Sequence, residues 1–127
     1  MVIFDANVIL RLVLQDNPAM VEEAKKRLSQ DICFIPVEVV AEIVYVLSRV
    51  YGVERTVVAQ TLTDVASVKN VTFAQQHVVL HALRVYASTA FDFVDCLLAG
   101  YAEEDQYTIF TFDKKLRKYL KDKTIPR

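Results

Sequence analysis

Short apolar segments alternate with longer stretches of helical periodicity along this chain. The segments at residues 2–4, 32–35 and 71–73 are almost wholly apolar and have the length of buried strands. A strand that is apolar along its whole length must be covered on both faces, which is typical of a parallel sheet between layers of helices. The expected fold class is therefore α/β, a three-layer α/β/α sandwich with a central, mainly parallel sheet.

Helix signals fill the intervals between these segments. Pro18 fits the first turn of a helix, Gly52 fits the end of another, and Asp92 fits an N-cap. A further apolar segment at 108–112 ends at Asp113. The expected strands are 2–4, 32–35, 71–73, 108–112 and a short terminal one near 124–125, and the expected helices are 7–14, 18–28, 37–51, 54–68, 75–87, 93–104 and 114–120.

The composition is that of one globular domain. The chain has 127 residues, of which 54% are apolar and 24% charged, with only 2 Gly and 3 Pro, so disordered and fibrous classes are excluded. We expect a single domain over 1–127. No apolar run approaches the roughly 18 residues of a membrane span, and the N-terminus lacks the pattern of a signal peptide, so a cytoplasmic location is expected.

The two cysteines show no metal-binding or redox spacing. Cys33 falls in an expected strand and Cys96 in an apolar helix, where a buried thiol is an ordinary packing residue. Cys96 adjoins Asp95, which leaves a nucleophilic role as the alternative, although no histidine stands in an obvious position to activate the thiol.

Four acidic residues occupy places from which carboxylates are normally excluded. Asp5 and Asp113 follow expected strands, whereas Glu42 and Asp95 lie in apolar helices. Ligands of parallel sheets bind beyond the carboxyl ends of the strands, where Asp5 and Asp113 would lie. Clustered carboxylates repel each other and lose hydration, and a divalent cation reverses that penalty.

Each acid also has a simpler explanation when it is taken singly. Asp5, Asp92 and Asp113 are all placed to cap a helix, and Glu38, one turn before Glu42, suits the dipole of a first helical turn. Taken together, the four acids favour a metal site. Oxygen ligands without Cys or His suit Mg²⁺ or Mn²⁺, which would activate a water for in-line attack on a phosphodiester.

The charge is unevenly distributed. Residues 114–127 contain seven basic residues and one acidic residue, whereas the first 113 residues contain eight basic and fifteen acidic ones. A basic end beside an acidic site would hold nucleic-acid phosphates, and a solvated helix face is the alternative.

Four segments resemble the motifs of the PIN domain family in their order along the chain, and within it the chain is similar to VapC-type toxins of toxin–antitoxin modules. The segments are Val-Ile-Phe-Asp5-Ala-Asn7, Val-Ala-Glu42-Ile, Phe-Asp92-Phe-Val-Asp95-Cys-Leu-Leu-Ala and Thr111-Phe-Asp113-Lys-Lys-Leu.

The resemblance implies a Mg²⁺- or Mn²⁺-dependent ribonuclease. Asp5, Glu42, Asp95 and Asp113 would be its catalytic metal ligands. Asn7, Asp92 and Thr111 would support them. It also implies a homodimer and a small antitoxin partner that blocks the site. No motif position departs clearly from the family pattern.

Several alternatives stay open. A phosphatase or phosphotransferase would use Asp5 as a covalent nucleophile, but such enzymes generally have a second Asp where this chain has Asn7. A non-catalytic PIN-like module would bind RNA or protein without turnover. His77 and His81 have metal-ligand spacing, but they lack further ligands nearby, which favours an ordinary helix face.

Two further expectations concern surfaces. Aromatic residues near the motifs would stack RNA bases, although most aromatics at such spacing belong to the core. Helices 37–51 and 54–68 carry more apolar surface than one sheet face covers, which indicates a dimer interface. The residues on which this interface rests are Val37, Val44, Tyr45, Leu47, Val50, Tyr51, Val53 and Val57.

Overall fold

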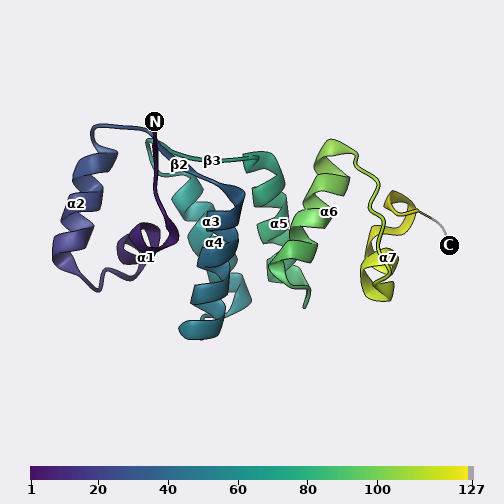
Figure 1. Cartoon of the computed structure of the whole chain (residues 1–127). Coiled ribbons are helices and arrows are strands. Elements are labelled where there is room, and N and C mark those ends of the chain that lie inside the picture. Colours follow the sequence, from purple (N-terminus) through teal and green to yellow (C-terminus); the bar gives the residue numbers. More distant parts are fainter. Residues whose placement is uncertain (126–127) are drawn as a thin grey trace.

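A parallel three-stranded sheet lies along one edge of the molecule, and most of the helices extend from it to one side (Figure 1). The structure, a computed structural model, describes residues 1–125. Within this range it has seven α-helices, and the expected α/β fold class with a parallel sheet is confirmed. The strands are β1 (Val2–Ile3), β2 (Cys33–Ile35) and β3 (Val71–Phe73), in the order β1-β2-β3.

Local sequence signals mark the start of several helices. α2 (Pro18–Leu28) starts with Pro18 after Asn17, whose side chain accepts a hydrogen bond from the Met20 amide at 3.1 Å. The other helices are α1 (Ala6–Leu14), α3 (Val37–Tyr45), α4 (Arg55–Ala66), α5 (Gln76–Ser88), α6 (Phe93–Asp105) and α7 (Lys114–Leu120).

The helix expected at 37–51 is divided in the structure. After α3 it continues as the π-helix η1 (Val46–Val50), and Gly52 ends it with a left-handed φ of 64°, a backbone conformation that glycine adopts without strain. A single 3₁₀ turn, η2 (Lys121–Lys123), follows α7.

The strand expected at 108–112 is not part of the sheet, which corrects the sequence analysis. Only Ile109 forms a β-bridge, parallel to Thr124, with the Ile109 amide donating to the Lys123 carbonyl at 2.8 Å. The terminal strand expected near 124–125 is reduced to the same bridge. The apolar alternation of 108–112 predicts an extended segment correctly, but it does not specify which strand pairs with it.

The core joins the sheet to the helices and is densest between α5 and α6. β2 lies at the centre of this core, because its residues Cys33 and Ile35 are both fully inaccessible. On α6, Gly100 faces the backbone of α5, where an added Cβ would lie 2.7 Å from the Val78 carbonyl oxygen. The absence of a side chain at Gly100 is therefore what allows the two helices to approach so closely.

We predict that Gly100→Ala destabilises the protein by about 1–3 kcal/mol, because the new methyl group must displace the α5 backbone. The better helix propensity of alanine offsets only about 0.5–1 kcal/mol of this cost. Urea unfolding measures the change, and Glu103→Ala, an exposed substitution on α6, serves as the control. An unchanged or higher midpoint for Gly100→Ala would contradict the close approach of the two helices.

Candidate metal centre

Three of the sequence-predicted acids are N-caps. The side chains of Asp5, Asp92 and Asp113 each accept a hydrogen bond from the amide three residues later, at 3.1, 3.0 and 3.0 Å. They begin α1, α6 and α7 respectively. Capping holds each carboxylate at the start of a helix, where the helix dipole favours negative charge.

Asp92, Asp95 and Asp113 form one acidic group. Asp95 lies in the first turn of α6, three residues after Asp92, the residue that caps this helix. Burial raises the pKa of the Asp95 carboxyl above its ordinary value, and the nearby charges of Asp92 and Asp113 raise it further. The fold therefore places Asp113, which is remote in sequence, close enough to Asp95 for the two charges to repel each other, as those of Asp95 and Asp92 do.

Aromatic packing brings α7 to the start of α6. The rings of Phe91, just before α6, and Tyr119, on α7, meet edge to face with their centroids 5.4 Å apart. Thr111 supports the turn that leads to Asp113, because its hydroxyl accepts a hydrogen bond from the Asp113 amide at 3.1 Å. Thr111 thus contacts the backbone of Asp113, and its role as a support of a metal ligand stays a prediction.

Asp5 caps α1, and Glu42 lies on α3. α1 packs on α3, so the helix that Asp5 caps is a neighbour of the helix that carries the exposed Glu42. α1 and α7 lie towards opposite ends of the molecule, with α3, α5 and α6 between them (Figure 1). Asn7, on α1, lines a groove beside β1.

The chemistry of the donors suits a hard divalent cation, but the arrangement in one chain does not complete a site. Carboxylate oxygens are the ligands that Mg²⁺ and Mn²⁺ prefer. Among residues 1–125, however, no three His, Cys, Asp or Glu side chains are arranged to hold a metal ion together. Asp95 is near both Asp92 and Asp113, whereas Asp5 caps α1, which lies towards the opposite end of the molecule from α7.

An arginine that the sequence pattern does not single out supports the acidic group. Arg55 of α4 lies over the Tyr86 ring, 3.7 Å from its centroid, and donates hydrogen bonds to the carbonyls of Tyr86 and Phe91. It thereby holds the loop between α5 and α6 that ends at Asp92. The sequence gives no signal for this role, because Arg55 starts an amphipathic helix where an exposed cation is ordinary.

The histidines pair with carboxylates across two helices. His77 and His81 of α5 lie 2.6 and 2.8 Å from carboxylate oxygens of Asp105 and Glu104 on α6. They stabilise the α5–α6 contact, and within the described residues they are not part of a metal cluster.

Both cysteines are packing residues. Cys33 and Cys96 are fully buried, and burial raises the pKa of each thiol to about 11. At neutral pH the thiolate is therefore scarce, which argues against the nucleophilic alternative for Cys96.

We predict that Asp113→Asn lowers the pKa of Asp95, because it removes a neighbouring negative charge. Asparagine caps a helix as well as aspartate does, so α7 should keep its start. An NMR titration of the Asp95 side-chain carboxyl measures the shift. Asp64→Asn, on the exposed surface of α4, is the matched control, and an equal response to both substitutions would contradict the acidic group.

The comparison with known proteins supports the motif analysis. The sequence matches the PIN domain family over residues 2–121, nearly the whole chain. No curated protein and no solved structure gave a match. PIN domains are generally nucleases, and they typically use divalent metal ions. The chain, with its α/β fold and its ordered acidic motifs, belongs to the PIN domain family.

Proposed function

We propose that the protein is a Mg²⁺- or Mn²⁺-dependent endoribonuclease. Asp5, Glu42, Asp95 and Asp113 would be the acidic metal ligands, supported by Asn7, Asp92 and Thr111. The observation that carries the proposal is the acidic group at the start of α6 and α7, where burial and like charges disfavour ionisation of Asp95. Such an arrangement costs folding free energy, and cation binding would offset that cost.

The positive charge of α7, next to the acidic group, supports a nucleic-acid substrate. α7 begins immediately after Asp113 and exposes Lys114, Lys115 and Lys118, while Arg117 donates a hydrogen bond to the Thr111 carbonyl at 3.2 Å. Cations next to the acidic group would hold the phosphates that flank a scissile bond. RNA is proposed over DNA because of the resemblance to VapC-type toxins, and a single strand or loop is the form whose backbone is accessible.

The resemblance to VapC-type toxins extends the proposal to partners and location. We propose that the whole chain acts as one PIN domain in the cytoplasm, as a homodimer inhibited by a small antitoxin. None of the helices in residues 1–125 is long and apolar enough to cross a membrane.

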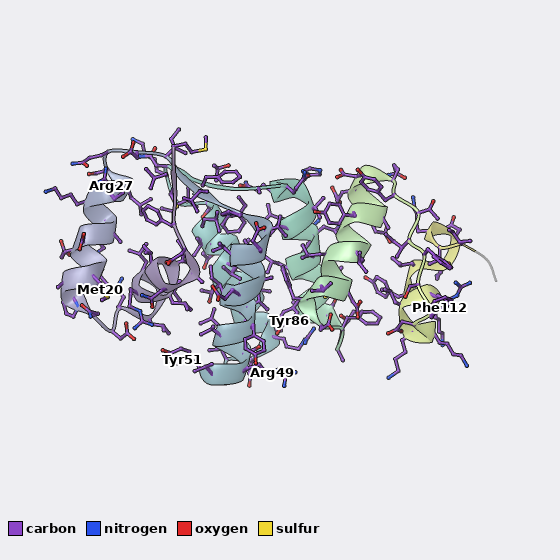
Figure 2. All side chains as sticks on the ribbon, in the orientation of Figure 1. Met20, Arg27, Arg49, Tyr51, Tyr86 and Phe112 are labelled. Atoms are coloured by element: carbon purple, nitrogen blue, oxygen red, sulfur yellow. The ribbon has the colours of Figure 1, made fainter. Side chains whose placement is uncertain are left out.

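The dimer surface proposed from the sequence needs one correction. Val44 and Leu47 are core residues, only 2% exposed, and so do not contribute to a surface. Tyr45, Val50 and Val57 remain exposed there, and Figure 2 shows Tyr51 and Arg49 at the same end of the helix pair.

One observation favours a second candidate, a non-catalytic module that binds RNA or protein. Within residues 1–125 the acids of a single chain do not come together as a metal site. RNA binding that is unaffected by a chelator, without cleavage at any metal concentration, would favour this alternative.

We predict that the protein cleaves a mixed RNA pool in the presence of Mg²⁺ or Mn²⁺ and not in EDTA. Asp95→Asn should lower the cleavage rate by about 100-fold or more, since it removes a proposed ligand. Asp64→Asn, an equal change of charge on α4, should leave the rate unchanged. Full activity in EDTA, or in Asp95→Asn, would refute the proposed function.

A further inference from the structure

Segment 107–112, which leads into α7, exposes an aromatic surface. The rings of Phe110 and Phe112 meet edge to face, with their centroids 5.3 Å apart and their planes at 66°. Phe110 is 66% exposed, although the residue before it, Ile109, is buried. An edge-to-face contact covers at most one face of a ring, so Phe110 keeps an apolar ring surface in contact with solvent. Contiguous exposed apolar groups are typical of binding surfaces.

The residues on both sides of Phe110 are fixed by hydrogen bonds to the backbone. The Ile109 amide donates to the Lys123 carbonyl at 2.8 Å. The Thr111 carbonyl accepts from the Arg117 guanidinium at 3.2 Å. Phe110 is therefore held at a defined place on the surface, and a ligand that stacks on its ring loses little affinity to the ordering of this segment.

Cations follow this aromatic surface along the chain. Residues 106–125 contain six basic residues and two acidic ones. Lys114, Lys115 and Lys118 are exposed on α7, and none of the ion pairs described for residues 1–125 involves them. Figure 2 shows Phe112, the ring that packs on Phe110, beside α7. Aromatic rings next to cations are typical of surfaces that bind a single-stranded nucleic acid, because bases stack on the rings while phosphates bind the cations.

The composition of this surface argues against a protein as the occupant. Protein interfaces are depleted in lysine, and their fully buried centres are depleted in charge. Here three exposed lysines follow the aromatic pair on the next helix. A polyanion pairs with these cations, whereas an apolar protein surface would have to bury them. Charge complementarity therefore favours a polyanion that carries flat, stackable groups, which is a nucleic acid.

We propose that Phe110 stacks on an unpaired base of the RNA substrate, while the lysines of α7 hold the phosphates next to that base. The proposal rests on the proposed ribonuclease function for its ligand. Phe110 lies three residues before Asp113, at most about 10 Å along an extended chain, which corresponds to a few nucleotides. The stacked base therefore lies close to the bond that the acidic group would cleave. Since a base in a duplex is already paired and stacked, Phe110 selects RNA that is single-stranded beside the cut.

Binding to a single-stranded RNA oligonucleotide in EDTA, where the proposed nuclease is inactive, tests the stacking. Phe110→Ala should weaken this binding by about 5- to 150-fold, the effect of losing one stacked base. Phe110→Tyr keeps the ring and should bind as the wild type does. The control is Tyr51→Ala, which removes an exposed ring that Figure 2 shows away from α7, and it should leave the affinity unchanged. Wild-type affinity in Phe110→Ala would overturn the proposal.

Further ligands separate stacking from a structural role of the ring. An oligonucleotide of the same length without bases should bind wild type and Phe110→Ala equally, because it has nothing to stack. A duplex of the same sequence should also show no difference between the two proteins. If Phe110→Ala bound all three ligands more weakly, the ring would be structural and the stacking would be refuted.

Salt dependence separates the role of the ring from that of the lysines. The slope of log affinity against log salt concentration should be the same in Phe110→Ala as in the wild type, because the ring carries no charge. In Lys118→Gln the slope should become shallower by about 0.7, since one phosphate contact of a single strand is lost. A shallower slope in Phe110→Ala would contradict stacking as the cause of its weaker binding.

Phe110→Trp would report the stacking directly, because the chain contains no tryptophan. This variant should bind the single-stranded oligonucleotide at least as tightly as the wild type does, and its fluorescence should be quenched by the stacked base. The oligonucleotide without bases should leave the emission unchanged. An emission that changes with protein concentration in the absence of RNA would show that a second copy covers the ring, which would overturn the proposal.

Kinetics separate the stacking from the proposed function. If the wild type cleaves RNA, Phe110→Ala should raise KM for a single-stranded substrate about as much as it weakens binding and should leave kcat unchanged, since the base stacks equally in the ground state and the transition state. Cleavage with an unchanged KM in this variant would refute the stacking alone. RNA binding that depends on Phe110 without any cleavage would refute the ribonuclease function alone. RNA that the wild type neither binds nor cleaves would refute both.

Discussion

Helix capping by aspartate fixes where the acidic side chains of this protein lie. Asp5, Asp92 and Asp113 each bond to a first-turn amide, an interaction worth about 1 kcal/mol that accounts for an oxygen acceptor at each position. Asparagine would serve equally well as a cap, so capping explains the geometry and not the charge. The negative charges of Asp92 and Asp113 raise the pKa of Asp95, and this repulsion opposes the favourable interaction of each charge with its helix dipole.

Local signals were sufficient to predict most elements. The helix at 18–28, the helix at 114–120 and the strand at 71–73 match the structure to the residue, since Pro18 and Asp113 mark helix starts and β3 is a short apolar run. The helix predicted at 37–51 was less well described. Its apolar periodicity does not distinguish an α-helix from the π-helix that follows α3.

The residues of the candidate site stay a prediction, because within residues 1–125 no group of them is arranged to hold a metal ion. Motif order indicated the acids, but the pairing of 108–112 depends on where a distant strand edge lies, which a local pattern does not encode. The role of Arg55 was not predicted for the same reason. Arg55 donates hydrogen bonds to the carbonyls of Tyr86 and Phe91, which lie more than thirty positions along the chain. Likewise, the surface position of His77 was predicted but its pairing with Asp105 was not, because Asp105 lies on another helix.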